Sequence, residues 1–293
     1  GTGQLEKETN DTVPQATPFD VSRPLTGRLY NTTDIDFFSF RLEAPRYLEL
    51  NFSAPGSTGN YTLTLFKESD QYEIDGIDIF GGQAATFLHM GLGAGRYYLR
   101  VKGGLTNVDT IRYYTLTIRD SPQTDMEIES NNTLKVANAI DKDKTKRGRI
   151  YSSQDKDYYG FHLPEAAFLS FTFTPTTTTG DYKVSLVDEN YEKTNLPLTY
   201  YTSANGAVVT AADIYFAAPG NYYLKIDPNG DIAQYKTYSL SLTSAAAITG
   251  LKQLVNLAVL GTKDKLMVND TQTLSATAGY SDATSSPVSS LAW

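Results

Sequence analysis

The stretch that decides the fold is Asp34-Ile35-Asp36-Phe37-Phe38-Ser39-Phe40, which recurs as Asp155-Lys156-Asp157-Tyr158-Tyr159-Gly160-Phe161. In an extended chain alternate side chains point the same way, so Phe38 and Phe40 share one face. In both places two aspartates, two residues apart, come directly before the aromatic run. The pattern predicts a duplicated β-strand whose first residues are acidic.

The surrounding sequence repeats in the same register. Leu5-Glu6-Lys7-Glu8-Thr9-Asn10-Asp11 returns 121 residues later as Met126-Glu127-Ile128-Glu129-Ser130-Asn131-Asn132, and Gly27-Arg28-Leu29-Tyr30 returns as Gly148-Arg149-Ile150-Tyr151. Further on, Gly95-Arg96-Tyr97-Tyr98-Leu99 matches Gly220-Asn221-Tyr222-Tyr223-Leu224 at a spacing of 125. The length differences fall in 67–94 and 188–219, where loops tolerate insertions. We therefore expect two tandem domains, a first repeat at 1–121 and a second repeat at 122–245.

Both repeats are patterned as strands. Apolar residues alternate in Leu48/Leu50/Phe52, Tyr97/Leu99/Val101 and Tyr114/Leu116/Ile118. Short strands separated by Gly, Pro and Asn turns predict an all-β fold, with a two-sheet antiparallel sandwich in each repeat. The one helical expectation is a turn or two near Thr133–Ala139.

Composition excludes several classes of protein. The 293 residues carry 25 Lys+Arg against 33 Asp+Glu, a formal net charge of −8, with two histidines and no cysteine. Disulfides, cysteine nucleophiles and cysteine-ligated metals are impossible. An acidic chain without a basic block lacks the footprint of nucleic-acid binding. No stretch has the length of apolar residues that a membrane span needs.

The pattern changes after the second repeat. Val255, Leu257 and Val259 alternate, and the run Lys265–Asp282 follows. This run resembles the opening strands of a bacterial Ig-like domain of group 2. A piece this short cannot bury a full sandwich core. We expect 246–293 to be a truncated third domain whose strand edges pair with a neighbouring chain or pack on the second repeat.

The densest polar cluster lies at the start of each repeat. In an extended segment Glu6, Glu8 and Asn10 point to one side, and Asp34 and Asp36 can close a shell of oxygen atoms around them. Oxygen ligands in this number, without His or Cys, suit Ca²⁺. The alternative is a solvated acidic strand edge that deters aggregation. Recurrence of both halves in the second repeat favours the metal site.

The ordered motifs E-x-E-x-N-[ND]-[TS], G-x-[LI], D-x-D-[FY]-[FY]-x-F, G-x-Y-Y-L and Y-x-L-x-[IL] resemble the bacterial pre-peptidase C-terminal domain, related to the collagen-binding domains of clostridial collagenases. The resemblance implies jelly-roll-like sandwiches and one Ca²⁺ per repeat. It implies that the ligand candidates are Glu6, Glu8, Asn10, Asp11, Asp34 and Asp36, then Glu127, Glu129, Asn131, Asn132, Asp155 and Asp157. Because Asn132 stands where the first repeat has an acid, we expect weaker binding there.

The outward face of the strand that carries the G-x-Y-Y motif is the predicted ligand-binding surface, and fewer residues support it than support the metal site. In the collagen-binding relatives an exposed aromatic strip follows the G-x-Y-Y motif. Alternation here directs Tyr98, Arg100 and Lys102 outward in the first repeat, and Tyr223, Lys225 and Asp227 in the second. Tyr98 and Tyr223 are therefore ligand-surface candidates. The alternative is ordinary cross-strand packing of a strand tyrosine.

No catalytic motif stands out. His89 and His162 lie inside expected strands, and the chain has no G-x-S-x-G, P-loop or H-E-x-x-H. The sequence favours a non-catalytic, calcium-stabilised spacer or ligand-binding module of a secreted or cell-surface protein from a Gram-positive bacterium. Its partner would be an extracellular polymer, protein or glycan. The alternative is an accessory segment of a secreted hydrolase, a peptidase or a polysaccharide-degrading enzyme, whose catalytic domain lies outside this chain.

Overall fold

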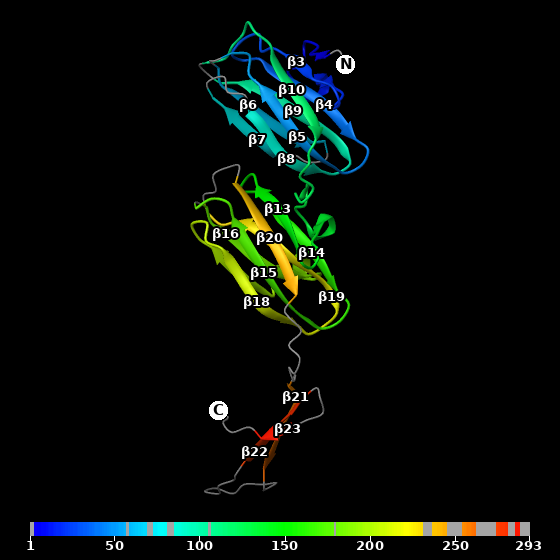
Figure 1. Cartoon of the computed structure of the whole chain (residues 1–293), viewed down its shortest axis with the longest axis vertical. Coiled ribbons are helices and arrows are strands. Elements are labelled where there is room, and N and C mark those ends of the chain that lie inside the picture. Colours follow the sequence, from blue (N-terminus) through cyan, green and yellow to red (C-terminus); the bar gives the residue numbers. More distant parts are fainter. Residues whose placement is uncertain are drawn as a thin grey trace. The chain divides into compact units, whose positions relative to one another are not determined.

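Strands make up nearly all of the regular structure in this computed structural model (Figure 1). It describes residues 3–56, 59–68, 73–80, 85–104, 107–178, 180–230 and 236–244, and the strand backbones at 254–261, 274–280 and 285–287. Over these residues the only helical pieces are α1 (Tyr191–Thr194) and the 3-10 turns η1 (Val13–Gln15) and η2 (Leu134–Val136). The expected turn near Thr133–Ala139 is confirmed as η2.

The first repeat contributes strands to two sheets. In spatial order, one sheet contains β1 (Gln4–Leu5), β3 (Leu25–Gly27), β10 (Tyr114–Asp120), β5 (Arg46–Ser53), β8 (Ala85–Leu92) and β11 (Ile128–Glu129). The other contains β2 (Thr17–Pro18), β4 (Ile35–Leu42), β9 (Gly95–Gly103), β6 (Tyr61–Lys67) and β7 (Glu73–Ile79). The strand β11 comes from the start of the second repeat.

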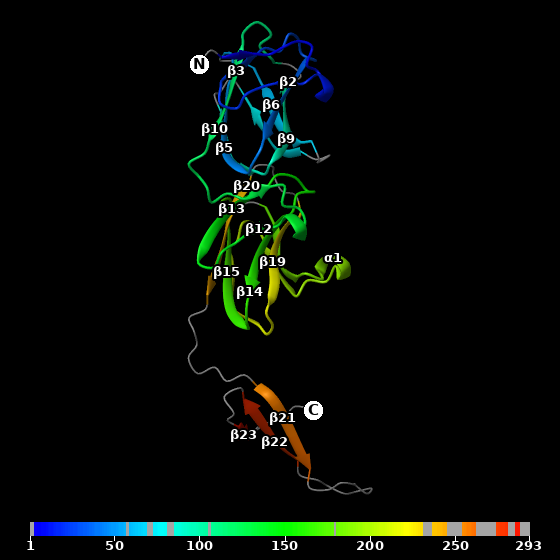
Figure 2. The same cartoon turned by 90° about the vertical axis from the view of Figure 1, so that its right-hand side faces the viewer.

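The second repeat builds the same two layers, which Figure 2 shows edge-on. One sheet contains β13 (Lys144–Ile150), β20 (Lys236–Ser244), β15 (Ala167–Pro175) and β18 (Val209–Phe216). The other contains β12 (Asn138–Ala139), β14 (Asp157–Leu163), β19 (Gly220–Pro228), β16 (Tyr182–Asp188) and β17 (Thr199–Ser203).

Both repeats have the strand order of a jelly roll. From β3 to β10, successive strands change sheet at every step except between β6 and β7, which form a hairpin in one sheet, giving β3-β10-β5-β8 facing β4-β9-β6-β7. From β13 to β20 the order is equivalent. These eight-strand double Greek keys confirm the predicted all-β, jelly-roll-like sandwiches.

The buried faces are those that the alternation predicted. Phe38, Phe40 and Leu42 are at most 4% exposed. The buried apolar residues form two separate cores, one drawn from residues between 19 and 118 and the other from residues between 140 and 242. Each sandwich therefore has a hydrophobic core of its own.

An aromatic cluster is duplicated in the two cores. The Phe52 ring lies 5.3 Å from the Tyr114 ring, and the equivalent Phe173 ring lies 5.0 Å from the Tyr238 ring. Contacts of this kind stabilise by about 0.5–1.5 kcal/mol beyond the buried area. They fix the position of the two tyrosines, whose hydroxyl groups matter below.

Residues 246–293 form the second compact unit. The strands β21 (Leu254–Gly261), β22 (Leu274–Tyr280) and β23 (Ser285–Pro287) make an antiparallel meander. Strands thus lie where the alternation indicated them, while the predicted association of this segment stays a prediction. Over the described ranges, no helix combines the length and the apolar character needed to cross a membrane.

Candidate metal centre

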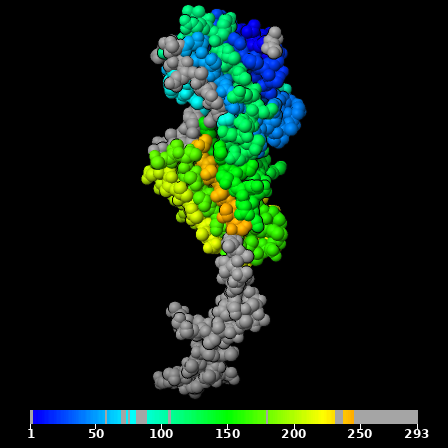
Figure 3. All heavy atoms as spheres, in the orientation of Figure 1, coloured from blue at the N-terminus to red at the C-terminus, as the bar shows by residue number. Residues whose placement is uncertain are grey.

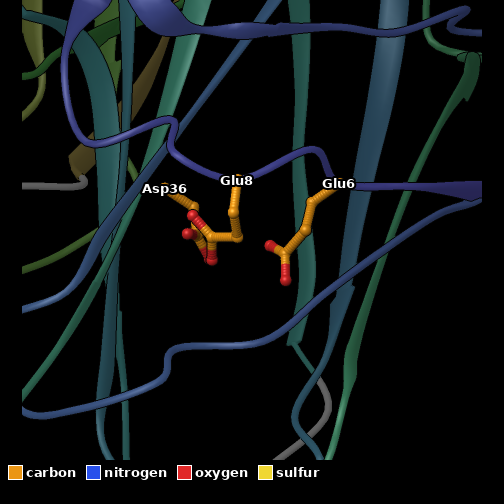
Figure 4. A group of neighbouring side chains, drawn as sticks. All are labelled: Glu6, Glu8 and Asp36. Carbon is orange, nitrogen blue, oxygen red and sulfur yellow. The ribbon is translucent and has the colours of Figure 1, made fainter.

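The acidic segment of the first repeat lies against the start of β4. The Phe37 N–H donates to the Asn10 carbonyl oxygen at 2.9 Å, which holds the segment beside the strand. One carboxylate oxygen from each of Glu6, Glu8 and Asp36 lies within 4.8 Å of the other two. Figure 4 shows the three side chains extending toward the same side of the segment.

A second acidic group shares one residue with the first. Glu8, Asp11 and Asp34 also bring one oxygen each within 4.8 Å of one another. The Tyr30 N–H donates to Asp34 Oδ2, which fixes the turn before β4. The structure thus brings all six predicted ligands of the first repeat into one cluster: Glu6, Glu8, Asn10, Asp11, Asp34 and Asp36.

The inner end of this cluster is buried. Asp36 has no exposed surface, and the Tyr114 hydroxyl donates to its Oδ2. Glu6 Oε1 accepts from the Arg28 N–H at 2.7 Å, whereas Glu6 Oε2 is buried and accepts no hydrogen bond. A buried anionic oxygen without a donor is costly unless a cation lies beside it.

The amide of Asn10 also points into the cluster. One terminal atom of this fully buried side chain lies 3.2 Å from Asp36 Oδ1 and 3.1 Å from Glu8 Oε2, and with nitrogen at that position the amide donates to both carboxylates. In the metal-free cluster Asn10 therefore satisfies these two oxygens, and its own oxygen would reach a cation only after the amide turns over.

Burial makes these carboxylates poor anions in the metal-free protein. Burial, reinforced by the charges of Glu6, Asp34 and Glu8, raises the pKa of Asp36 to about 9. Burial, with the charge of Glu8, raises the pKa of Glu6 to about 7. A divalent cation reverses this logic, because its charge favours the ionised carboxylates.

The second repeat builds an equivalent cluster. Glu127, Glu129 and Asp157 bring one oxygen each within 4.8 Å of one another. The Tyr158 N–H donates to the Asn131 carbonyl oxygen at 3.2 Å, as Phe37 does to Asn10 in the first repeat. The acidic segment is therefore held against its strand in the same way.

Two oxygens of the second cluster lack a donor. Tyr238 donates to Asp157 Oδ2 at 2.5 Å, while Asp157 Oδ1 is buried without a partner. Asn131 Nδ2 donates to Glu127 Oε2 at 3.1 Å, and Asn131 Oδ1 is likewise buried and unpartnered. Burial, together with the charge of Asp155, raises the pKa of Glu127 to about 8.

Without metal, the carboxylates of the second cluster receive more hydrogen bonds than those of the first. Tyr159, which stands where the first repeat has Phe38, donates to Glu127 Oε2 at 2.8 Å. Asn132, which replaces Asp11, accepts from the Lys156 N–H at 3.0 Å through Oδ1. The contact of Asp155 is shared by both clusters, since its Oδ2 accepts from the Tyr151 N–H at 2.8 Å as Asp34 Oδ2 does from the Tyr30 N–H. The second cluster has one more hydroxyl donor and one fewer acid.

The donor set fits a hard cation. Oxygens that share one Ca²⁺ each lie about 2.4 Å from it, so two of them can be at most about 5 Å apart. The groups within 4.8 Å meet this limit in both repeats. Carboxylate and amide oxygens without nitrogen or sulfur suit Ca²⁺ among the common metals.

Sequence reasoning missed the tyrosines beneath the clusters. Tyr114 and Tyr238 recur in the Y-x-L motif and were expected only as core residues. Their rings do lie in the cores, but their hydroxyls reach Asp36 and Asp157. A buried tyrosine needs a hydrogen-bond partner, and this requirement was the available signal.

The predicted ligand surface is only half-exposed. Tyr98 and Tyr223 are both half-buried, and the Tyr98 hydroxyl lies 3.4 Å from Glu68 Oε1. Lys225 faces away from the core as predicted but is 7% exposed, with its Nζ 3.2 Å from the Tyr191 hydroxyl. The insertion that carries α1 covers this lysine, so the outward face of the second repeat is smaller than alternation indicated.

His89 lies in a polar group near the junction of the repeats. Its Nδ1 is 2.7 Å from Ser121 Oγ and 3.9 Å from Glu49 Oε2, and the Gln123 N–H donates to Ser121 Oγ. A serine nucleophile needs a histidine whose two nitrogens serve the serine and the acid separately. Both groups face the same nitrogen here, so this arrangement is not a nucleophile relay.

Comparisons with known proteins give likenesses of fold. No family model matches the chain, and no curated protein matches it. Among solved structures it is similar to the pre-peptidase C-terminal domain of a collagenase from Bacillus anthracis, at 27% identity and a TM-score of 0.30, covering 36% of this chain and 93% of that one.

Two further solved structures share lower identity. The tandem CBM22-1–CBM22-2 domain of Xyn10C from Paenibacillus barcinonensis is 11% identical, with a TM-score of 0.26, and the match covers 71% of this chain and 82% of that one. The PBSX exported protein XepA is 13% identical, with a TM-score of 0.23, covering 75% and 85%. The match to the collagenase domain spans about the length of one repeat.

Proposed function

We propose that each repeat binds one Ca²⁺ in its acidic cluster and that the chain is a non-catalytic, calcium-stabilised spacer or ligand-binding module of a secreted or cell-surface protein. The observation that carries the proposal is the convergence of buried oxygens without donors, Glu6 Oε2 in the first repeat and Asp157 Oδ1 and Asn131 Oδ1 in the second. Such oxygens at equivalent clusters in two repeats suit a repeated ligand better than a solvated strand edge.

The cation would act as a clasp. Glu6 and Glu8 lie in the segment before η1, whereas Asp36 lies in β4. An ion bound to all three joins the N-terminal segment to the body of the sandwich and neutralises the buried charges. Because only the folded chain brings these residues together, calcium stabilises it by mass action, by about 2.7 kcal/mol at a hundredfold excess over Kd.

The test is calorimetric titration of the metal-stripped protein with Ca²⁺, followed by thermal melting with calcium and with chelator. We expect two sites in the wild type, one in Asp36→Ala and one in Asp157→Ala. Asp141→Asn, a change at an exposed residue, is the matched control and should keep both sites. Absence of calcium binding and of any calcium-dependent stabilisation in the wild type would overturn the proposal.

For the ligand-binding role, we infer an extracellular polymer, protein or glycan, that contacts Tyr98 and Tyr223. Both side chains face away from the cores and keep part of their surface exposed. Co-sedimentation with insoluble collagen and with insoluble polysaccharides measures this directly. Retention that falls in Tyr98→Ala and Tyr223→Ala supports the assignment, and retention unchanged by both substitutions contradicts it.

A further inference from the structure

The start of the second repeat is docked on the first repeat. Ile128 and Glu129 of β11 pair in parallel with Gly91 and Leu92 of β8, and the Gly93 N–H donates to the Glu129 carbonyl oxygen at 3.2 Å. The strand therefore extends a sheet of the preceding sandwich. In Figure 3 the atoms of the first repeat, blue to cyan, abut the green atoms of the second.

Two side chains of the second repeat are buried by this docking. Met126 is 7% exposed and lines a small cavity with Ile74 and Met90 of the first repeat. Tyr151 is 4% exposed and donates from its hydroxyl to Glu73 Oε2 of the first repeat at 3.0 Å. The interface thus combines strand addition, an apolar plug and a tyrosine hydrogen bond.

The first repeat presents the same elements without cover. Leu5 occupies the position of Met126, since Leu5 pairs in parallel with Thr26 as Met126 does with Arg147, each 121 residues later. Leu5 is 71% exposed. Tyr30, at the position of Tyr151, is 47% exposed. We call this surface of Leu5, Lys7, Glu8 and Tyr30 the leading face.

Tyr30 is held on this face by its neighbours. The Arg28 guanidinium carbon lies 3.9 Å from the centre of the Tyr30 ring and 5.3 Å from that of Tyr113, which is 51% exposed. Exposed tyrosines around an arginine are the residue types that are enriched at the centres of protein interfaces.

We propose that the leading face is the docking site for a further β-sandwich module of the same kind as the first repeat. The incoming module would add its edge strand to Lys7–Glu8 as β8 adds to Ile128–Glu129, cover Leu5, and accept a hydrogen bond from Tyr30. In the described part of the chain no strand pairs with Lys7 and Glu8. The argument is continuity with the junction that the molecule already contains.

The edge of the incoming module needs glycine at two positions. A Cβ on Gly91 would lie 2.1 Å from the Glu127 carbonyl oxygen, and a Cβ on Gly76 would lie 2.6 Å from the Tyr151 hydroxyl. The contact at Gly91 is with backbone, so a side chain there blocks the approach of the following module. At Gly76 a side chain would displace the Tyr151 hydroxyl, and it would also meet the Leu63 carbonyl oxygen of its own repeat at 2.8 Å.

This requirement excludes the free edge of the second repeat as the partner. The strand register places Tyr200 where the first repeat has Gly76, and Tyr215 where it has Gly91. The glycine-containing edge of the first repeat is already covered by the second repeat of the same chain. Among the described strands of the two sandwiches, a second molecule therefore offers no suitable edge, and the partner is a separate glycine-edged sandwich module.

A three-module chain tests the proposal. Residues 1–125 are joined to Leu5 of the chain, so that the linker that normally leads to Met126 leads to Leu5 instead. The peptide across the new junction is unique and reports hydrogen exchange at Glu8. In calcium we expect this amide to exchange about tenfold or more slowly than in the parent chain.

The control is the same chain with Gly76→Tyr and Gly91→Tyr in the added module only, the residues that the second repeat has there. It should lose the protection at Glu8. Equal exchange in the three-module chain, the control and the parent would overturn the proposal. So would a dimer of the parent chain in analytical ultracentrifugation that Leu5→Asp abolishes, because it would assign the leading face to a second molecule.

A second test does not depend on folding of the added module. The double substitution Met126→Leu and Ile128→Lys gives the existing junction the sequence Leu-Glu-Lys-Glu of the first repeat, because Glu127 and Glu129 already match Glu6 and Glu8. If the leading face is competent for docking, Glu129 keeps its slow exchange. Exchange at Glu129 as fast as in an unpaired segment would show that the first repeat's sequence cannot dock, and would overturn the proposal.

Discussion

Replacing Asp36 with asparagine should change stability in opposite directions with and without calcium. In the metal-free protein, burial raises the pKa of Asp36 from an ordinary 3.8 to about 9. An acid whose folded-state pKa is raised stabilises fully below its unfolded pKa, and this stability is lost as pH rises toward the folded pKa. Asparagine has nearly the same shape, carries no charge and can still accept from Tyr114.

The size of the effect follows from the pKa shift. From an unfolded pKa of 3.8 to pH 7 is about three pH units, each worth about 1.4 kcal/mol, so the buried acid costs about 4 kcal/mol at neutral pH. Asp36 has no exposed surface, so solvent screening reduces this little. In chelator, Asp36→Asn should therefore unfold at a temperature higher by about 10 °C or more.

Calcium should reverse the order. The ion neutralises the ionised Asp36 of the wild type, whereas asparagine offers a weaker, uncharged ligand. Thermal melts in chelator and in calcium, each at pH 5 and pH 8, measure all four states. In chelator the wild type should be more stable at pH 5 than at pH 8, and the variant should show a smaller difference. The reasoning fails if Asp36→Asn is destabilised in chelator or responds to calcium as the wild type does.

Three further changes probe the centres and the junction. Tyr159→Phe removes a hydrogen-bond donor to Glu127 and should lower the free energy of unfolding in chelator by about 1–3 kcal/mol, with a smaller loss in calcium. Urea melts measure both losses, and equal losses would mean that the hydroxyl is unrelated to the site. Proteolysis at 121–131 should be fast in chelator and slow in calcium, because the ion ties this segment to Asp157, and equal rates would contradict the clasp. Gly91→Ala places a Cβ 2.1 Å from the Glu127 carbonyl oxygen, so it should speed hydrogen exchange at the Glu129 amide and leave the amides of β14 unchanged. Unchanged hydrogen exchange at Glu129 would mean that the junction accommodates the methyl group without losing its pairing.

Much of this architecture is predictable from residue patterns. Alternation identified the buried faces because each sandwich has one core, and Phe38 and Phe40 have no other place to be buried. The acidic clusters were predictable because their members sit two residues apart on extended segments. Glu6, Glu8 and Asp36 converge as the spacing indicated.

The features that were not predictable depend on contacts between distant segments. Lys225 is covered by the α1 insertion, which has no counterpart among the described residues of the first repeat. The pairing of β11 with β8 depends on Gly91, which looks like an ordinary strand residue until the neighbouring sandwich is in place. The tyrosines beneath the clusters combine packing with hydrogen bonding, and a pattern of apolar positions records only the packing.

The position of Tyr114 and Tyr238 has a consequence for the order of assembly. Each belongs to the last strand of its sandwich, yet its hydroxyl reaches an aspartate 78 or 81 residues earlier in the chain. A chain that emerges vectorially from a ribosome or a translocation pore, N-terminus first, exposes its acidic segment early but cannot complete the site until nearly a whole module has emerged. Under the calcium binding proposed above, delivery into a medium that contains calcium would then complete the sites module by module, in the order of the sequence.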